Sequence, residues 1–437
     1  MLNSILKLVL MVSERMRIKL PYGKDKTVIV DILDKNVLFV ADRGVAPPLK
    51  NPRDEVRRAL KKPIGTPSLQ ELVGPKDKVI IVGDDITRPT PQSIIVPVLL
   101  DELNAVGIPN ENIQVIIALG THREMGEKEI REKYGSEVVK RVPVVNHDFK
   151  DLKKLVDMGK TETGIPISVN KEVYDADFVI GVGNIVPHCL AGWAGGGKII
   201  QPGVCGEETN AMTHVMAAKV RPVTKLVGNL DSRVRREIDA IAVKAGLKLI
   251  VNTVLNREDK ISHVVVGDPI KAFREGVKVA QGIYCPEVPG LADIVVVSSY
   301  PADIDYYQAC KPLAYASLAV KQGGTMVLIT PSPEGISPIH PILKERATLT
   351  YSENLEAIDK KEIDDLIAGA ILLVHAQIME RAEVICYSNG LTDEDKKALG
   401  FKHANTVEEA MEMAFKSQGK DAKVGILKCG EILPIMK

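Results

Sequence analysis

The sequence predicts an α/β protein made of two Rossmann-like domains with mostly parallel sheets and an interdomain cleft. Three observations support this prediction. Short runs rich in Val and Ile recur between stretches with helical apolar spacing, as in a parallel sheet covered on both faces. The length of 437 residues suits two or three domains. The content of 45% hydrophobic and 26% charged residues is ordinary for a globular protein.

The first half of the chain supplies most of the expected elements. An alternating strand begins at Met16, and residues 1–15 are interpreted as a loose extension or a result of start-codon choice. Two helices are expected at 91–106, opened by Pro91 at an early-turn position, and at 128–137. Five further strands are expected, at 78–83, 113–119, 142–145, 177–183 and 248–255.

A second βαβ series begins near Leu291. Strands are expected at 293–298 and 325–330, around a helix at 310–322, and further strands near Ala382 and Lys423. Gly and Pro accumulate between 270 and 290, although the helical stretch 270–281 suits either side of a boundary there. We therefore expect an N-terminal domain of residues 1–275 and a C-terminal domain of residues 276–437.

Charge and composition narrow the class of partner. The 57 Lys and Arg residues balance 57 Asp and Glu, so no positive field gathers nucleic acid or anionic lipid. Aromatic residues are only 4%, with one tryptophan, Trp193, which disfavours base stacking. We expect a small-molecule partner, no nucleic acid and no membrane. Six scattered cysteines without a CxxC pair, and no signal peptide, fit a cytoplasmic protein.

Polar residues directly after predicted strands are the first candidates for a site, because ligands of open α/β sheets bind beyond the carboxyl ends of strands. The turn DDITRP brings Asp85 and Arg88 together, either as a functional pair or as an N-cap with a surface ion pair. The turn GTHR carries His122, for which structural and functional interpretations both stand. For His147, in a third turn, we favour a turn role.

The segment from Gly181 to Lys198 is the densest in glycine, and it delivers Lys198 to a point that a bound group can approach closely. Two familiar motifs match this segment poorly. Val186 replaces the last glycine of a dinucleotide fingerprint. Ile199 replaces the hydroxyl residue that a GxxxxGK phosphate loop needs for Mg²⁺. Neither HExxH nor GxSxG occurs, which counts against standard hydrolases.

Two further groups complete the candidates. After Lys198, the loop PGVCGEET leads into a helix that carries His214, while Cys205 in that loop is interpreted as a small buried residue. In the second half, Gln308 and Lys311 are three residues apart, so on a helix they share a face and could meet a carboxylate together. An ordinary helix start with a snorkelling lysine explains them equally well.

Taken together, the DDITRP and GTHR turns and the segments PHCLAGWAGGGK, PGVCGEET and YQACKP closely resemble the nickel-pincer lactate racemase family. The motifs occur in the family's order over nearly the whole chain, with 16 residues from Lys198 to His214. The resemblance implies an isomerase, a racemase or epimerase of lactate or a related 2-hydroxy acid. It also implies a nickel-pincer nucleotide, the nickel complex of pyridinium-3,5-bisthiocarboxylic acid mononucleotide, made by partner biosynthesis enzymes. Protein produced without those enzymes is expected to be apo.

The family's residue roles carry over motif by motif. Lys198 matches the lysine joined to the cofactor through a thioamide, and His214 matches the nickel ligand. The resemblance assigns acid and base catalysis to His122 and His188 and an essential pair to Asp85 and Arg88, with the arginine near the substrate. The remaining assignments are the glycines beside the cofactor ring, Gly195, Gly196 and Gly197, and the substrate-facing group of a closing second domain, Tyr307, Gln308 and Lys311.

One departure concerns the substrate. Lactate-specific members have a tryptophan near the site from the C-terminal half, whereas this chain has only Trp193. Hydride transfer is the expected chemistry, because removing the α-proton of a 2-hydroxy acid puts a carbanion beside a carboxylate. Two alternatives remain open at this point: a nicotinamide-dependent oxidoreductase and a non-catalytic nickel or cofactor carrier.

Overall fold

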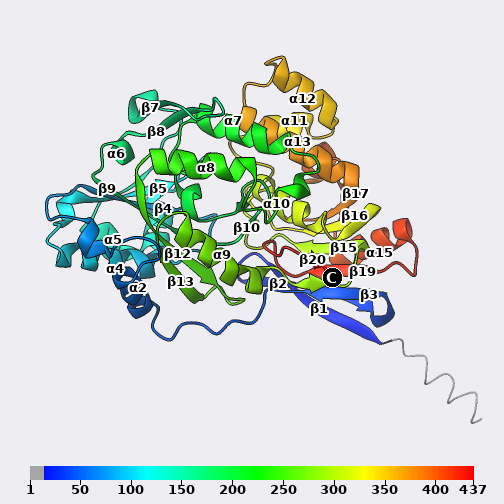
Figure 1. Cartoon of the computed structure of the whole chain (residues 1–437). Helices are drawn as coiled ribbons and strands as arrows, with labels where there is room; N and C mark the ends of the chain where they lie inside the picture. The colour runs from blue at the N-terminus through cyan, green and yellow to red at the C-terminus, as the bar shows by residue number, and fades with distance from the viewer. Residues whose placement is uncertain (1–13) are drawn as a thin grey trace, which may run out of the picture. The chain divides into compact units, whose positions relative to one another are not determined.

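The computed structural model describes residues 14–437, and the chain folds into two compact units whose segments alternate in sequence (Figure 1). Unit 1 comprises the described residues up to Asp42 together with 287–335 and 378–437, and unit 2 comprises residues 43–286 and 336–377. This grouping differs from the contiguous division at 275 and 276 that the sequence suggested. The expected extension at the N-terminus lies outside the described residues, except for Glu14 and Arg15.

Unit 2 is built on a six-stranded sheet in the order β13-β12-β9-β4-β5-β6. All neighbouring pairs are parallel except β12 and β13. The central strands are almost fully buried and rich in Val and Ile, which explains why the sequence located them. The strands are β4 (Val79–Asp84), β5 (Ile113–Ala118), β6 (Val144–Asn146), β9 (Phe178–Asn184), β12 (Leu247–Leu255) and β13 (Ile261–Gly267).

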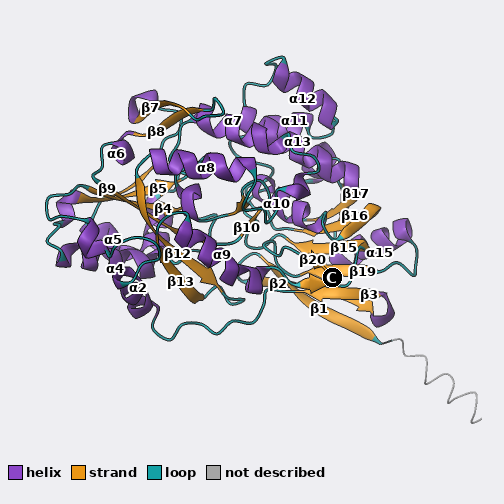
Figure 2. Cartoon of the chain, viewed as in Figure 1, coloured by secondary structure: helices purple, strands orange, loops and turns teal. Residues whose placement is uncertain are grey.

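Helices pack around this sheet (Figure 2). Helix α4 buries Ile95, Val98 and Leu99 against the strands, and the two helices expected in this region are confirmed with bounds shifted by a few residues. The helices of the first segment are α2 (Pro52–Lys61), α3 (Leu69–Leu72), α4 (Gln92–Ala105), α5 (Glu127–Arg141), α6 (Lys171–Tyr174), α7 (Glu207–Ala218), α8 (Arg233–Lys244) and α9 (Lys271–Tyr284). Two hairpins lie outside the main sheet: β7 (Leu155–Lys160) with β8 (Pro166–Asn170), and β10 (Pro187–His188) with β11 (Gly192–Trp193).

The segment 336–377 belongs to unit 2 although it lies in the second half of the chain. It carries α11 (Ile342–Arg346), α12 (Tyr351–Asp359) and the first part of α13 (Leu366–Arg381). The Gln377 side chain accepts from Val223 N at 2.8 Å and donates to Ala218 O at 3.1 Å, so it satisfies backbone groups at the end of α7. These long-range hydrogen bonds leave no local signature, which is why a contiguous division was expected.

Unit 1 holds a second six-stranded sheet, fully parallel, in the order β18-β17-β16-β15-β19-β3. Its edge strand β3 comes from the N-terminal part of the chain and pairs with β19 near the C-terminus. The strands are β3 (Val37–Ala41), β15 (Ala292–Ser298), β16 (Val320–Ile329), β17 (Ala382–Tyr387), β18 (Lys402–Ala404) and β19 (Val424–Leu427). The short strands β14 (Glu287–Val288) and β20 (Ile435–Met436) pair separately, and β1 (Arg15–Tyr22) forms the expected early strand, in a hairpin with β2 (Lys26–Leu33).

The helices of unit 1 are α10 (Tyr306–Ala316), α14 (Asp393–Ala398) and α15 (Val407–Gln418). The helix expected at 310–322 is wrong at its end, because Val320 already pairs with Ala292 in the sheet. The α/β class with mostly parallel sheets is confirmed. Within residues 14–437, no helix has both the length and the apolar run required to cross a bilayer.

Candidate active site

The turn after β4 gives its two adjacent carboxylates different surroundings. Asp84 accepts from Gln92 Nε2 at 2.9 Å and from the Thr90 hydroxyl, and it pairs with Lys133 Nζ at 3.2 Å. The Lys133 ammonium also donates to the backbone carbonyl of Arg88. Asp84 is therefore a buried anchor that ties the end of the strand to α4 and α5. The motif alone did not separate this role from that of Asp85.

Asp85 instead pairs with His122, whose Nδ1 lies 2.6 Å from Asp85 Oδ2. Its other oxygen, Oδ1, accepts from the backbone N and the hydroxyl of Thr87 at 3.1 and 2.6 Å. Burial by itself raises the pKa of Asp85, but His122, Arg88 and Thr87 together lower it further, so the net pKa lies well below the usual range. An ionised Asp85 holds the proton of a neutral His122 on Nδ1, which leaves a lone pair on Nε2.

The Arg88 side chain lies beside this pair. Its Nη1 donates to the carbonyl and the hydroxyl oxygen of Thr87, both at 3.0 Å, and its charge contributes to the lowered pKa of Asp85. The arginine is half-buried. Its planar guanidinium is anchored to the turn through the one nitrogen Nη1. The structure thus brings together Asp85, Arg88 and His122, which the sequence placed after two neighbouring strands.

His147 has a structural explanation. Its Nε2 lies 3.0 Å from the carbonyl oxygen of Cys205, and its Nδ1 lies 3.1 Å from Asn170 Nδ2. Burial lowers the pKa of His147 to about 4, so the ring is neutral, and it connects its own turn to the end of β8 and to the loop that carries Cys205. Burial also raises the pKa of the Cys205 thiol, in agreement with the prediction of a small buried residue.

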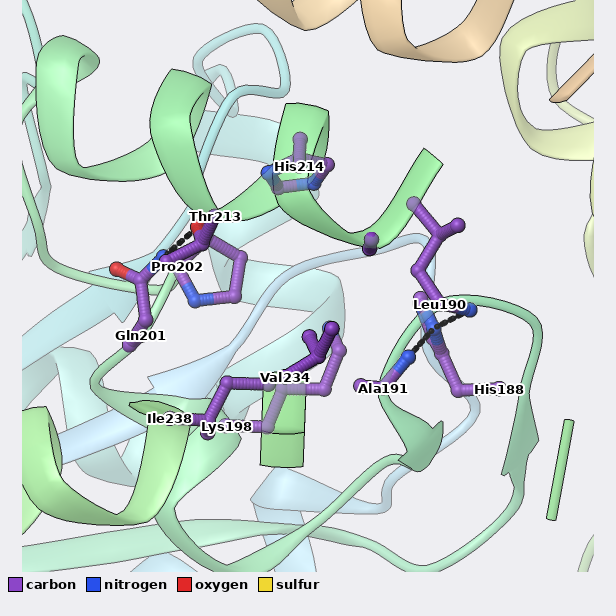
Figure 3. Close-up of a pocket in the computed structure, with 11 residues that line it drawn as sticks. His188, Leu190, Ala191, Lys198, Gln201, Pro202, Thr213, His214, Val234 and Ile238 are labelled. Carbon is purple, nitrogen blue, oxygen red and sulfur yellow. Dashed lines mark hydrogen bonds between the residues drawn. The ribbon is translucent and has the colours of Figure 1, made fainter. Parts of the chain in front are cut away.

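A pocket of unit 2 gathers three of the candidate residues: His188, Lys198 and His214 (Figure 3). Its wall includes residues of the lysine turn and of helices α7 and α8, and most of it is apolar. The other lining residues are Leu190, Ala191, Gln201, Pro202, Thr213, Ala217, Val234 and Ile238. The turn that carries His122 is bonded to the residue that follows the lining residue Pro202, because Gly120 N donates to Gly203 O at 2.9 Å.

Two histidines of the pocket have defined hydrogen bonds at Nδ1. His214 Nδ1 lies 2.7 Å from the carbonyl of Asn210, one turn earlier on α7, so a neutral ring carries its proton there and a lone pair on Nε2. His188 has the opposite arrangement, because its Nδ1 accepts from the backbone N of Leu190 and of Ala191, both at 3.2 Å (Figure 3). A neutral His188 therefore carries its proton on Nε2.

The glycines before Lys198 pack against protein. Gly195 and Gly196 have φ of 95° and 58°, values that favour glycine. A Cβ would lie 2.9 Å from Ile185 Cγ1 at Gly195, 2.7 Å from Phe273 Cγ at Gly196 and 2.9 Å from Ala242 Cβ at Gly197. The 3-10 turn η4 (Gly196–Ile199) then directs Lys198 to the pocket. Contact between these glycines and a cofactor stays a prediction.

The remaining candidates lie in unit 1, on helix α10. Asp305 caps the helix through Gln308 N at 2.8 Å, and Lys311 Nζ donates to Gln308 Oε1. Gln308 and Lys311 therefore share one face of the helix, as their spacing predicts. Tyr307 and Gln308 are buried.

Gln201 is a pocket residue that the sequence analysis missed. Its Nε2 donates to Thr213 Oγ1 at 2.6 Å, while its buried Oε1 has no hydrogen-bond partner among residues 14–437. A glutamine three residues after the candidate lysine has no pattern that marks it as functional. Across the same described residues, no group of three or more His, Cys, Asp or Glu side chains is arranged to hold a metal.

The chain matches two described family domains: the lactate racemase N-terminal domain over residues 22–225 and the lactate racemase C-terminal domain over residues 289–432. The lactate racemase of Lactiplantibacillus plantarum is 29% identical over 429 residues, which cover 94% of this chain and 98% of the relative. The lactate racemase of Thermoanaerobacterium thermosaccharolyticum is 30% identical over 322 residues, which cover 73% of this chain and 75% of the relative.

Two solved structures share the fold of this chain. The lactate racemase apoprotein of Thermoanaerobacterium thermosaccharolyticum superposes with a TM-score of 0.85 at 27% identity, covering 97% of this chain and all of that one. A protein from Thermotoga maritima shares the fold, with a TM-score of 0.73 at 20% identity over 90% of this chain and 100% of that one. The family domains and these relatives define an isomerase of the racemase class. The chain belongs to the lactate racemase family.

Proposed function

We propose that the protein racemises lactate or a related 2-hydroxy acid by reversible hydride transfer to a nickel-pincer nucleotide attached to Lys198. The observation that carries this proposal is the pocket that Lys198, His214 and His188 line together, with the Asp85–His122 pair on the adjoining turn. The names of the two relatives favour lactate. A substrate with a different side chain remains compatible with a chain whose one tryptophan is Trp193.

The residues of the pocket fit this cofactor. Apolar side chains such as Leu190 and Pro202 suit the faces of a flat pyridinium ring. The Nε2 lone pair of His214 suits a borderline metal such as nickel, and the Nδ1 bond to Asn210 fixes the orientation of the imidazole. The unpartnered Oε1 of Gln201 would accept a hydrogen bond from a hydroxyl of the nucleotide.

When bound, the cofactor supplies an electron-poor acceptor for the hydride on C2, which no side chain can supply. His122 takes the hydroxyl proton at Nε2, and the buried Asp85 carboxylate stabilises the imidazolium that forms. The Arg88 fork binds the substrate carboxylate and fixes its orientation. The resulting keto acid is flat at C2, so rotation about its bond to the carboxylate presents either face.

His188 acts on the substrate oxygen from its Nε2. A neutral ring that accepts these two bonds at Nδ1 carries its proton on Nε2, so this nitrogen would polarise the keto oxygen as a hydrogen-bond donor. To deliver a full proton, His188 must also be protonated at Nδ1, which replaces the bonds from Leu190 N and Ala191 N. The two histidines are therefore unequal at rest, with His122 prepared as a base and His188 as a donor.

The residues of α10 would act on the bound substrate from unit 1. The Lys311 ammonium is the positive charge of this face, and its bond to Gln308 limits its rotamers. We propose that unit 1 closes over the substrate with these two side chains. Closure of this kind excludes water and protects the transient keto acid.

The test uses protein produced together with the cofactor biosynthesis enzymes and a panel of chiral 2-hydroxy acids that includes lactate. Chiral chromatography follows the enantiomers, and the reaction is run in D₂O. Hydride return predicts that C2 gains no deuterium from solvent, whereas a carbanion route predicts exchange. Lys198→Ala serves as the control that cannot be loaded. Racemisation by that variant, or activity that depends on added NAD, contradicts the proposal.

A further inference from the structure

The turn before Lys198 is held by a buried arginine from helix α8. Arg235 Nη1 donates to Trp193 O at 3.2 Å and to Gly195 O at 3.3 Å, and its Nη2 reaches Gly195 O at 3.3 Å. Nη2 also pairs with Asp239 Oδ1 at 2.6 Å. One guanidinium thus bridges α8 and both carbonyls that flank Ala194.

Arg235 is itself locked in place. Its side chain is 1% exposed, and its guanidinium carbon lies 3.9 Å from the centre of the Phe273 ring on α9. The start of α8 is fixed by Ser232, whose hydroxyl accepts from Arg235 N at 3.1 Å. A buried charge that loses its partners is strongly destabilising. Moving the guanidinium away from the turn would therefore cost folding free energy.

Two further hydrogen bonds hold the turn, one to strand β12 and one to the loop before α8. Asn252 on β12 accepts from Gly196 N at 2.9 Å through its Oδ1, and Trp193 Nε1 donates to Gly228 O at 2.9 Å. A Cβ at Gly196 would lie 2.8 Å from Arg235 Nη2, so the glycine is required by the arginine that packs on it. The turn is held by these contacts immediately before the residue that enters the pocket.

We propose that Arg235 is a positioning residue for Lys198. By holding the carbonyls of Trp193 and Gly195 it fixes the path of the turn, and the path of the turn directs the lysine side chain to the pocket. Arg235 is not one of the residues that line the pocket. The consequence for cofactor attachment rests on the proposed function of Lys198, whereas the holding of the turn does not.

Trp193 provides a direct probe, because it is the one tryptophan of the chain and it lies in the held turn. The experiment compares wild-type apoprotein with Arg235→Met, Arg235→Lys and a matched control, Arg236→Met. Arg236 is the neighbouring arginine on α8, and it is exposed, donating to Asp231 O at 2.6 Å. Acrylamide quenching of tryptophan emission reports on the turn, and mass spectrometry measures the labelling rate of Lys198 by an amine reagent.

Arg235→Met leaves the carbonyls of Trp193 and Gly195 and the Asp239 carboxylate without their cation. We therefore expect the acrylamide quenching constant of Trp193 and the labelling rate of Lys198 to change by about tenfold. Arg235→Lys restores one charge but not the fork, so an intermediate change is expected. Arg236→Met should match wild type. Wild-type quenching and labelling in a folded Arg235→Met protein would overturn the proposal. If that variant does not fold, wild-type values in Arg235→Lys decide against it equally.

Loading with the cofactor separates this inference from the proposed function. Arg235→Lys should carry less cofactor on Lys198 than Arg236→Met, as measured by intact mass. Full occupancy in Arg235→Lys would contradict the positioning role. Failure of wild-type protein to acquire any cofactor would instead contradict the proposed function, and the quenching and labelling results on apoprotein would stand.

Discussion

Replacing Asp85 by Asn should reverse the tautomer of His122 while leaving the turn intact. Oδ1 of Asp85 accepts two hydrogen bonds from Thr87, so the amide oxygen of the variant keeps that position. The amide nitrogen then occupies the place of Oδ2, which lies 2.6 Å from His122 Nδ1. An NH₂ group there donates to Nδ1 and forces the proton of the neutral ring onto Nε2. His122 thereby loses the lone pair that accepts the substrate proton.

The expected cost follows from that change. General base catalysis contributes about 10² to 10⁴ in rate, and loss of the charge that stabilises the imidazolium acts in the same direction. We expect kcat of the loaded enzyme to fall by about 10³ or more, with unchanged nickel content because His214 lies on another element. Circular dichroism measures racemisation, and ¹⁵N NMR of the apoprotein reports which nitrogen of His122 is protonated.

Asp85→Glu is a useful control because it retains the charge but not the distance. The role of His122 as base would be refuted if the tautomer is reversed in Asp85→Asn while kcat stays within about threefold of wild type, which is on the order of experimental scatter. A tautomer that does not reverse would refute the hydrogen-bond argument itself.

Four further predictions follow from the site. His147 has a pKa of about 4 when folded, below its ordinary value, so its contribution to stability is complete above about pH 6.5 and is lost as pH falls toward 4. Between pH 7 and pH 5, urea unfolding should show a loss of about 2 kcal/mol in wild type that His147→Gln lacks, and an equal loss in both would contradict the linkage. His214→Ala should abolish nickel retention, as measured by metal analysis; a variant that keeps nickel would remove His214 as the ligand. His188→Ala should keep the metal and lose turnover, and normal kcat in it would exclude His188 from proton transfer. Lys311→Ala should raise KM with normal nickel content, whereas nickel loss would point to a role in holding the cofactor.

Much of the fold follows from local patterns. The buried Val and Ile runs of β4, β5 and β9 identify a parallel sheet, since strands buried on both faces have no polar alternation. The end of α10 was placed too late, because in the strand that follows the buried Val320 precedes three exposed residues. In the sequence, exposed residues at the start of a strand look no different from the last turn of a helix.

The candidate site likewise has residues that the sequence identified and residues whose roles it did not identify. The search for polar residues after predicted strands identified His122, His188 and Lys198, because ligands bind at the carboxyl edge of a parallel sheet. The sequence could not distinguish Asp84 from Asp85, since that difference depends on Lys133 and His122, which come from other elements. Arg235 was missed for the same reason: its burial depends on residues of other elements, and the helical sequence around it does not indicate that burial.

The sequence by itself determined the fold class, the family and the residue types of the site, since these depend on periodicity and on motifs of contiguous residues. Only the tertiary structure decided which segments form each unit, which groups bond to Nδ1 of His122, His188 and His214, and what holds the lysine turn. The physical reason is the separation along the chain of the groups that interact. Propensities and turn chemistry act over a few neighbouring residues, whereas protonation and orientation depend on groups that the fold brings together from distant parts of the chain.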